Sequence, residues 1–499
     1  MRKLLLGLAL STAISATAQT QTPSFITKDL DQYIEDGIRD WSIPGLAIAI
    51  VKDGKVVYMK GFGVRDVATK EPVDENTLFM IASNSKLFTG TALAQLEYNQ
   101  KLSLDDKITK FFPGYTLYDK NTTDLVTVRD MLTHHLGTKT FQGDFTFWNS
   151  SLSRRQIMDK MKLLKPVAGF RNSFGYCNSC FLTAGEVIPV VSGKPWEVYV
   201  YDSILMPLKM ANTHTLGLGM SEMPNAARPY TSAFTGEVTP IPYDQVDNIG
   251  PAGSIVSNVK DLTHWLMFQL DSGRYEGKHI MPWAVLQRTR EANTLTNKAG
   301  SVFYGLGVFQ RYYQNRRVLW HTGGADGFVT NTCFVPEEGL GITILTNNDN
   351  QSFFELLRMQ ILDAYFGVPF VNKSKEALPG FKKEQAKTIS DIKALQARVT
   401  GKAPALPVSA YTGSYKNELM GTIKITASGN VLNVELPDHG QLRARLEYMD
   451  NNEWLLSYNH IAFGIFPTKF KIQNNKVVSV DLKVSDFLEY DPYTFVKEN

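Results

Sequence analysis

Two groups of strand-like segments lie far apart in this chain, and helical patterns fill the stretch between them. In the first group, residues 45–51 and 56–62 are apolar and rich in β-formers, and Asp53-Gly54 between them is a strong hairpin-turn signal. The second group comprises residues 304–309, 317–320, 330–336 and 340–346. An antiparallel sheet made from both groups, with the helical residues 84–292 inserted, fits this order better than a parallel sheet. We therefore predict an α+β fold in which helices flank an antiparallel sheet.

The pattern changes after residue 400, and the chain is too long for a single core. Hydrophobic cores rarely serve more than about 250–300 residues, whereas this chain has 499. Residues 382–398 predict a solvated helix, and residues 401–407 predict a linker. Beyond it, short alternating segments with polar turns predict a small all-β barrel or sandwich. The predicted domains are 27–370 for the first domain, 371–407 for the helix and linker, and 408–499 for the β-barrel-like domain.

The N-terminus has the three parts of a secretory signal peptide. A basic start at Arg2-Lys3 is followed by the apolar run 4–10 and by Ala16-Thr17-Ala18, a small-residue cleavage site. The apolar run is too short to span a membrane, and no other run of the chain reaches 18 apolar residues. We therefore predict a signal peptide over residues 1–18 and an exported protein without a transmembrane segment, periplasmic in a Gram-negative cell.

Composition and charge argue against several classes of protein. The 52 Lys and Arg nearly balance the 49 Asp and Glu, for a net charge of +3. This balance does not favour a nucleic acid as partner, because phosphate binding needs clustered basic residues. With 43% hydrophobic and 20% charged residues, the chain is neither disordered nor collagen-like nor a coiled coil. Its three cysteines are too few for a disulfide framework.

A Ser-x-x-Lys pattern occurs three times, at Ser83–Lys86, Ser257–Lys260 and Ser390–Lys393. The first copy is the candidate site, because the apolar run 78–82 leads into Ser83 and an apolar helical pattern follows it. We expect Ser83 at a buried helix N-terminus, with Lys86 one turn further on the same face. A serine hydroxyl becomes nucleophilic when a neighbour takes its proton, and a desolvated lysine with a lowered pKa can do so.

Two later segments complete a pattern with the first. Tyr176-Cys177-Asn178 precedes a helix-like run, and His321-Thr322-Gly323-Gly324 follows the strand that ends at Trp320. The ordered motifs Ser-x-x-Lys, Tyr-x-Asn and Lys/His-Thr-Gly resemble those of the serine β-lactamase and penicillin-binding-protein superfamily. The similarity is greatest to class C β-lactamases, family VIII esterases and D-aminopeptidases, and it covers about residues 30–355. Supporting stretches lie at residues 127–134, 251–262 and 304–307.

The resemblance implies a β-lactamase/transpeptidase-like fold and a role for each motif residue. Ser83 would be the acylated nucleophile, and Lys86 and Tyr176 would form the proton-transfer pair. In this scheme Tyr176 is the general base, once the charge of Lys86 lowers its pKa. Asn178 would orient the substrate's acyl-side amide. The backbone N–H groups of Ser83 and Gly324 would form the oxyanion hole.

The largest departure from the family pattern is His321, where penicillin-recognising relatives carry a lysine that binds the substrate carboxylate. Histidine has an ordinary pKa near about 6.5, so it would be mostly uncharged at neutral pH. We therefore expect His321 and Gly323 to line the substrate site, with weak or no β-lactamase activity and better hydrolysis of small esters or peptides. A carboxylate such as Asp326 could raise the pKa of His321 and reverse this expectation.

A second departure is Cys177 within Tyr-x-Asn, with Cys180 three residues later. Cys-x-x-Cys can indicate redox chemistry or a metal site, but no second cysteine pair and no nearby histidine pair completes such a site. We favour two small buried residues beneath the active site, and we expect neither a metal nor a cofactor. Whether the two cysteines pair stays open.

The sequence therefore predicts an exported serine hydrolase that works through an acyl-enzyme. The substrate, a small molecule or peptide, could be an ester, an amide, a β-lactam or a peptide with a D-residue, because a fold alone does not decide. The alternative is a non-hydrolytic penicillin-recognising binder or sensor. The C-terminal domain resembles the lipocalin-like module that often follows this catalytic domain. It would either pack against the main domain or line the substrate cleft.

Overall fold

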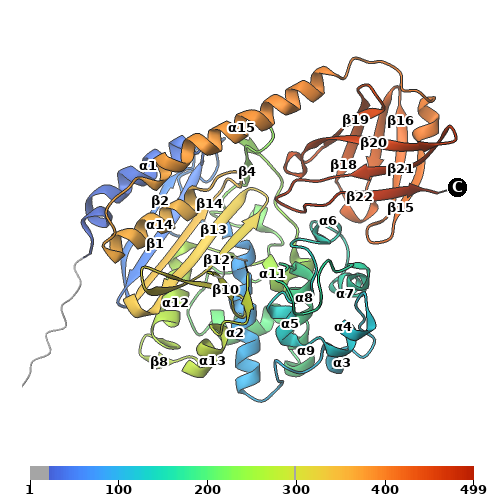
Figure 1. Ribbon diagram of the computed structural model, residues 1–499. Coiled ribbons are helices and arrows are strands. Elements are labelled where there is room, and N and C mark those ends of the chain that lie inside the picture. The colour runs from blue at the N-terminus through green and yellow to red at the C-terminus, as the bar shows by residue number, and fades with distance from the viewer. Residues whose placement is uncertain (1–21, 297–298, 300, 499) are drawn as a thin grey trace, which may run out of the picture.

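The computed structural model describes residues 22–296, 299 and 301–498, so the predicted signal peptide over residues 1–18 lies outside the described residues. Figure 1 shows a sheet flanked by helices, a helical region beside it and a separate C-terminal barrel. Within the described residues, no helix has both the length and the apolar character needed to cross a membrane.

The central sheet is antiparallel and takes its strands from both parts of the chain. Its order is β2-β1-β14-β13-β12-β11-β10-β9. The strands are β1 Gly45–Lys52, β2 Lys55–Gly63, β9 Thr294–Leu295, β10 Phe303–Tyr304, β11 Phe309–Tyr313, β12 Arg316–Ala325, β13 Phe328–Val335 and β14 Leu340–Thr346. β1 turns into β2 at Asp53-Gly54 and pairs on its other side with β14. The predicted sheet made from both groups of strands is confirmed.

One predicted strand is split in two. The segment 304–309 contains the end of β10, a turn and the start of β11. Gly307 in this turn has a φ of +84°, and a Cβ there would lie 2.2 Å from the Lys86 carbonyl oxygen. The chain therefore turns at this glycine and packs directly on the helix that carries Lys86.

Strand β1 is buried on both faces because helices cover each side of the sheet. Leu46, Ile48 and Ile50 pack in one hydrophobic cluster with α1 (Leu30–Asp40) and α14 (Phe353–Phe366). The alternate, smaller residues Ala47 and Ala49 belong to the cluster on the other face, which includes α12 (Val259–Leu270). This alternation follows from the period of two in a β-strand.

The remaining helices are mostly short and form the region that holds the site. They are α2 Ser85–Tyr98, α3 Ile108–Phe111, α4 Lys120–Leu125, α5 Val128–Leu132, α6 Asp144–Phe147, α7 Arg154–Lys160, α8 Asn178–Gly185, α9 Val187–Ser192, α10 Trp196–Val200, α11 Gly250–Gly253 and α13 Trp283–Thr289. Two-stranded pairs join β3 Phe79–Met80 to β6 Val256–Ser257, β4 Tyr230–Thr231 to β5 Thr239–Pro240, and β7 Arg274–Tyr275 to β8 Lys278–His279.

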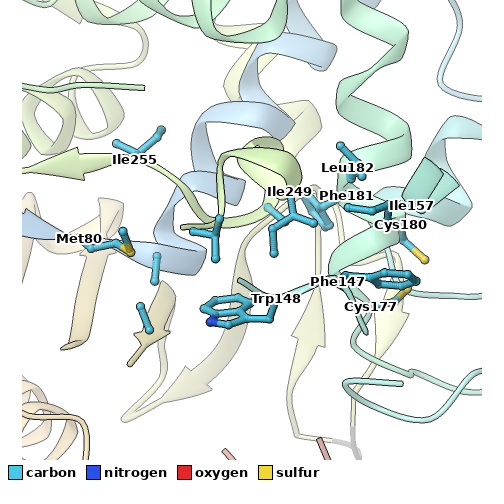
Figure 2. Close-up of a cluster of buried hydrophobic side chains, with 14 of the residues drawn as sticks. Met80, Phe147, Trp148, Ile157, Cys177, Cys180, Phe181, Leu182, Ile249 and Ile255 are labelled. Atoms are coloured by element: carbon cyan, nitrogen blue, oxygen red, sulfur yellow. The ribbon is translucent and has the colours of Figure 1, made fainter. Parts of the chain in front are cut away.

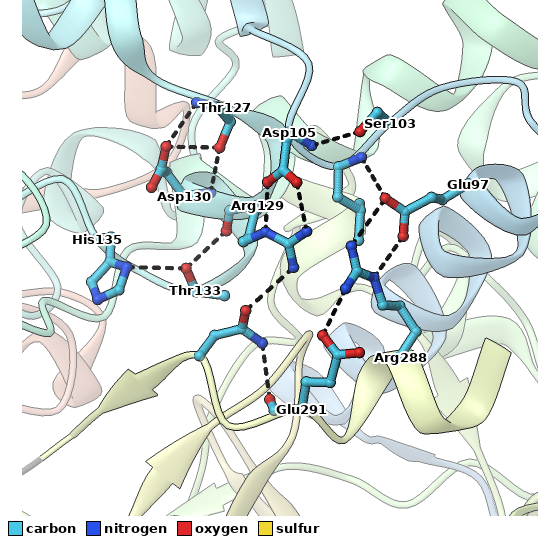
Figure 3. Close-up of polar contacts among 12 residues, drawn as sticks. Glu97, Ser103, Asp105, Thr127, Arg129, Asp130, Thr133, His135, Arg288 and Glu291 are labelled. Atoms are coloured by element: carbon cyan, nitrogen blue, oxygen red, sulfur yellow. Dashed lines mark hydrogen bonds and ion pairs between the residues drawn. The ribbon is translucent and has the colours of Figure 1, made fainter. Parts of the chain in front are cut away.

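Ion pairs hold parts of this helical region together, and one hydrogen bond joins it to the residue before β9 (Figure 3). Arg129 of α5 donates to Asp105 at 2.7 Å and to Asn293, next to β9, at 3.3 Å. Arg288 of α13 donates to Glu97 of α2 at 2.6 Å. These contacts hold the C-terminal end of α2 and the start of α5 in place.

The C-terminal domain is a closed barrel of eight antiparallel strands in sequence order. They are β15 Gly413–Asn417, β16 Gly421–Ser428, β17 Val431–Glu435, β18 Arg443–Tyr448, β19 Glu453–Tyr458, β20 Ile465–Gln473, β21 Lys476–Leu482 and β22 Tyr493–Lys497. The predicted small all-β domain is confirmed. The sequence pattern missed β22, which pairs with β15 and closes the barrel.

A long helix joins the two domains (Figure 1). Helix α15 spans Lys373–Ala397 and begins earlier than the predicted residue 382. The Asn372 side chain accepts the Lys375 N–H at 3.0 Å and caps its start. The helix continues through Pro379-Gly380, a pair that usually interrupts helices.

The barrel also packs against the first domain next to α6. The Phe145 ring of α6 contacts the rings of four barrel residues, His439, Tyr458, Phe463 and Tyr493, at centroid distances of 5.4–6.3 Å. Buried residues of the two domains form one continuous hydrophobic cluster. The barrel is therefore fixed against the helical region by apolar packing as well as by the linker.

Candidate active site

Ser83 lies where β3 has ended and α2 is about to begin. A short 3-10 turn, Ala82–Asn84, carries the serine and runs directly into α2. Ala82 has a φ of +47°, a left-handed conformation that side chains other than glycine rarely adopt. Ala82 and Lys86 are buried, whereas Ser83 is partly exposed. The strained turn thus presents the hydroxyl at the surface of a cavity, as expected of a nucleophile.

Lys86 is fully buried, and its amine contacts three oxygens. Nζ lies 3.0 Å from Ser83 Oγ, 2.7 Å from Asn178 Oδ1 and 2.8 Å from the Ala252 carbonyl oxygen. Burial lowers the pKa of Lys86 to about 7, although the nearby Asp144 carboxylate raises it. In the neutral amine, the two N–H groups donate to Asn178 and Ala252, so the lone pair faces the Ser83 hydroxyl. Lys86 can therefore accept the serine proton near neutral pH.

Asn178 begins α8 and connects Lys86 to a second buried carboxylate. Its Oδ1 accepts from Lys86, and its Nδ2 donates to Asp144 Oδ2 at 2.7 Å. These two partners fix which end of the amide is oxygen. Asn178 thus positions Lys86 and also lines the cavity. The sequence predicted only a role in orienting the substrate.

Tyr176 covers Lys86 with the face of its ring, 4.7 Å from Nζ to the ring centroid. Its ring stacks on His134 at 4.4 Å, and His134 Nδ1 accepts the Cys177 N–H at 3.0 Å, which fixes the tyrosine's backbone. Burial raises the pKa of Tyr176 well above 10, despite a hydrogen bond with Ser83 that lowers it. The expectation that Lys86 lowers the pKa of Tyr176 is therefore wrong for the free site, because desolvation of the phenol outweighs the other effects.

His321 is buried on β12, and the protein itself occupies both of its ring nitrogens. Nδ1 donates to the Thr322 carbonyl oxygen at 2.5 Å, so Nε2 accepts from the Tyr304 hydroxyl at 3.0 Å. Burial lowers the pKa of His321 to about 3, and the charge of Lys86 lowers it further. The imidazole is therefore neutral, as predicted, but it has no ring N–H left for a substrate.

Asp326 does not raise the pKa of His321, as the sequence suggested it could. Its backbone N–H donates to Asp244 at 2.7 Å, and its carboxylate lies 3.9 Å from Nε2 of His460 in the barrel. Burial and repulsion from Asp244 raise the pKa of Asp326 well above its ordinary value. Asp326 thus belongs to a separate buried carboxylate pair at the edge of the cavity.

The glycines of β12 allow this strand to approach the serine. A Cβ at Gly323 would lie 2.0 Å from the Ile81 carbonyl oxygen, so only glycine fits there. Pairing with β11 ends at Trp320, which leaves the edge of residues 321–325 without a strand partner on that side. Gly324 lies on this edge and faces the cavity that Ser83 lines. The oxyanion hole assigned to the N–H groups of Ser83 and Gly324 stays a prediction.

A cavity of about 480 Å³ opens in front of Ser83, and both domains line it. Its aromatic residues are Phe141, Trp148, Phe174, Tyr176, Phe309, Phe354, Phe487 and Tyr490. The loop 486–490, between β21 and β22 of the barrel, forms part of the wall. The Phe487 ring lies against Gly324, 3.0 Å from the place of a Cβ there. The barrel therefore lines the cleft in addition to packing against the main domain.

Cys177 and Cys180 are both buried and both free. Figure 2 shows them in a hydrophobic cluster with Phe147 and Phe181. Cys177 Sγ lies 3.2 Å from Ser179 Oγ. The interpretation as small buried residues beneath the site agrees with this environment, and the open question of pairing is answered by two free thiols.

Sequence reasoning missed three contributors to the site: Asp144, Tyr304 and the barrel loop 486–490. Tyr304 belongs to the motif at residues 304–307, but the sequence does not show that its hydroxyl contacts His321. Asp144 follows Gly143, whose φ of +94° marks a turn, yet nothing local indicates a catalytic neighbour. The loop lies far from the motifs in sequence.

Comparison with known proteins places this geometry in a family context. The family model described as Beta-lactamase matches residues 30–366, and one described as a domain of unknown function (DUF3471) matches residues 397–497. The chain is 26% identical over 345 residues to "Protein flp" of Staphylococcus aureus (strain COL), covering 67% of this chain and 66% of that protein.

Two further similarities extend over more of the chain. It is 25% identical over 429 residues to "Unguisins hydrolase ungD'" of Aspergillus campestris, covering 81% of this chain and 78% of that protein. The solved structure of the octameric penicillin-binding protein homologue from Pyrococcus abyssi superimposes with a TM-score of 0.61 at 22% identity. That similarity covers 94% of this chain and 99% of the other, and it supports the fold.

Proposed function

The chain belongs to the beta-lactamase family, and from this premise we propose that it is a serine hydrolase acting through an acyl-enzyme on Ser83. The observation that carries the proposal is the buried lysine. Lys86 Nζ lies 3.0 Å from Ser83 Oγ, its two other contacts are oxygen acceptors, and its pKa is lowered to about 7. A general base works best when its pKa lies near the working pH.

Acylation would begin when neutral Lys86 takes the proton of Ser83 Oγ. The oxygen attacks the substrate carbonyl carbon, and the resulting oxyanion accepts hydrogen bonds from the N–H groups of Ser83 and Gly324. The bond to the leaving group then breaks. A water molecule later attacks the ester on Ser83 while Lys86 takes its proton, and Lys86 returns that proton to Ser83 Oγ as the ester bond breaks and the acid leaves.

Tyr176 would act as an acid in the first half of the reaction. Its raised pKa keeps the phenol protonated, and its hydrogen bond with Ser83 places the phenol beside the reacting oxygen. The phenol can give this proton to the leaving group and recover one from Lys86⁺. The raised pKa therefore fits a donor better than the general base suggested by the sequence.

The cleft favours uncharged, apolar substrates. No lysine or arginine is among the residues that line the cavity in the described chain, and aromatic rings form much of its wall. His321 is neutral and has no free donor, so a substrate carboxylate gains no charged partner there. We propose esters or amides with an aromatic or apolar acyl group, hydrolysed better than anionic β-lactams.

The deciding experiment measures the fate of a label on Ser83. The enzyme is incubated with a fluorescent fluorophosphonate, which stays attached, and separately with a fluorescent penicillin and a series of p-nitrophenyl esters. We expect labelling at Ser83 by the fluorophosphonate and release of p-nitrophenol over many turnovers. A stable penicillin adduct without any ester turnover would instead favour a non-hydrolytic binder.

We also propose that the protein is exported, on the basis of the basic, apolar and small-residue order of residues 1–18. N-terminal sequencing of the protein expressed with this segment in a Gram-negative host tests the proposal. A mature chain that begins at Gln19 in the periplasmic fraction is expected. An uncleaved chain in the cytoplasm would refute it.

A further inference from the structure

A carboxylate of the barrel reaches into the first domain beside the site. Glu489 lies between β21 and β22 and is buried. Its Oε1 accepts the Gly143 N–H at 2.9 Å, and its Oε2 accepts the Phe145 N–H at 2.9 Å and the Tyr493 hydroxyl at 2.9 Å. The two backbone contacts lie on either side of Asp144.

Asp144 is in turn connected to the Ser83 hydroxyl through the side chains of Asn178 and Lys86. Asp144 Oδ2 accepts from Asn178 Nδ2 at 2.7 Å, and Asn178 Oδ1 accepts from Lys86 Nζ at 2.7 Å. Lys86 Nζ lies 3.0 Å from Ser83 Oγ. A continuous series of contacts thus connects the barrel to the reacting hydroxyl.

We propose that Glu489 is a positioning residue of the active site, which holds the backbone on both sides of Asp144 and thereby keeps Asn178 and Lys86 aligned with Ser83. This inference rests on the proposed function. Helix α6 has no side-chain cap of its own, because Gly143 occupies the capping position. The barrel supplies the missing acceptor, so the barrel is part of the catalytic unit.

Charge connects the same groups. Burial and repulsion from Glu489 raise the pKa of Asp144 well above its ordinary value. Burial likewise raises the pKa of Glu489 to about 7, with a further contribution from Asp491. Around Lys86 the titratable neighbours are Asp144, Cys177, His134 and His321, and Tyr176 covers it with its ring.

Loss of the Glu489 charge therefore has a signed consequence for the lysine. Without the repulsion, the pKa of Asp144 falls and Asp144 is more often ionised. An ionised Asp144 favours charged Lys86, so the pKa of Lys86 rises. The pH at which the site becomes active should move upward.

The test is the rate of Ser83 labelling by a fluorophosphonate as a function of pH, in full-length Glu489→Gln and its parent. Labelling forms the Oγ–P bond, releases fluoride and passes the serine proton to Lys86, so it reports the base without a known substrate. We expect the maximal rate to fall about 10-fold to 100-fold, the loss that a misplacement of about 1 Å can cause, and the midpoint to move to higher pH. Thermal unfolding of the variant and its parent checks that the variant is folded.

Two controls separate this role from general support of the interface. Lys160→Met removes the hydrogen bond that Lys160 of α7 donates to the Leu419 carbonyl oxygen of the barrel at 2.5 Å, and should leave the rate within about twofold and the midpoint unmoved. In an Asp144→Asn background, Glu489→Gln should no longer move the midpoint, because its route passes through Asp144.

The outcomes distinguish this inference from the proposed function. A parent that is never labelled at Ser83 overturns the proposed function itself. A labelled parent with a folded Glu489→Gln variant of unchanged rate and midpoint overturns only the role of Glu489. A lower rate with an unmoved midpoint, matched by Lys160→Met, would also overturn it, because that pattern is a general interface defect.

Discussion

The chain contains the same short pattern in two very different settings, Ser83–Lys86 and Ser257–Lys260. In the first, the lysine is buried and its amine lies 3.0 Å from the serine oxygen. In the second, the serine is buried and bound to Thr213 at 2.8 Å, while Lys260 is exposed and contacts Asn76 at 3.4 Å. Identical spacing therefore gives a buried lysine beside its serine in one place and an exposed lysine in the other.

The difference lies in what surrounds the lysine. Lys86 is enclosed by α8, by the carbonyl of Ala252 in α11 and by the ring of Tyr176. Removal from water is the main reason its pKa falls to about 7. Lys260 is instead exposed, so water rather than protein surrounds its amine. Burial, more than spacing, turns the pattern into a site.

The largest difference is expected between the alanine variants of Ser83 and Ser257. Ser83→Ala should abolish both turnover and fluorophosphonate labelling, because the nucleophilic oxygen is gone. Ser257→Ala removes a buried hydroxyl that contacts Thr213 instead of the reacting groups. Its turnover, corrected for the fraction of folded protein, should stay within about twofold of the parent's. Steady-state kinetics with thermal unfolding of both variants checks this. Retained labelling in Ser83→Ala would place the nucleophile elsewhere.

Substitution of the two lysines should change kcat to almost as different an extent. Lys86→Met keeps the apolar volume but removes the base, and we expect a loss of about 10²–10⁴-fold in kcat. Lys260→Met changes an exposed side chain and should leave kcat within about twofold. Pre-steady-state measurement of acylation in both variants is the appropriate assay. Equal losses in the two would contradict the contrast drawn between their environments.

Tyr176 tests whether the cover over Lys86 also transfers protons. Tyr176→Phe preserves the ring packing on Lys86 and His134 but removes the phenol, and we expect about a 10²-fold loss in kcat. The loss should be smaller for esters with good leaving groups, which need no proton. Tyr115→Phe, at a buried tyrosine that donates to Met161, is the control. A loss independent of the leaving group would assign Tyr176 to positioning alone.

The pH dependence follows from the same burial. The base must be neutral, so kcat/KM should fall about tenfold per pH unit below about 7 and level off above it. His321, with a pKa of about 3, is neutral throughout this range and adds no step. A pH–rate profile from 5 to 9 on a neutral ester measures the midpoint. A midpoint near 10 would mean that Lys86 is solvated.

The parts predicted from sequence are those fixed by local chemistry. Asp53-Gly54 specifies a hairpin wherever it lies, and the apolar entry to Ser83 specifies its buried turn. The three ordered motifs then identified the family fold, which the structure and the family model confirm.

The features that the sequence did not predict depend on contacts between residues distant in sequence or on a balance of opposing effects. Asp144 matters because Glu489 of the barrel fixes its backbone, and no local pattern near Asp144 shows that partner. The pKa of Tyr176 is raised because burial of the phenol outweighs its hydrogen bond with Ser83. The sequence identifies the titratable groups, but the direction of their pKa shifts depends on how deeply the fold buries them.

The smallest expected effect concerns Phe487, whose ring extends the enclosure of the first Ser-x-x-Lys pair from the barrel side. It lines the cleft against Gly324 and remains 41% exposed, so it can contact a bound acyl group. Phe487→Ala should raise KM about threefold to tenfold for a benzoyl ester, the value of one aromatic contact. KM for an acetyl ester, too short to reach the ring, should not change. Phe370→Ala, at an exposed phenylalanine outside the cleft, is the control. Equal changes for both esters would mean that the barrel loop shapes the cleft without contacting substrate.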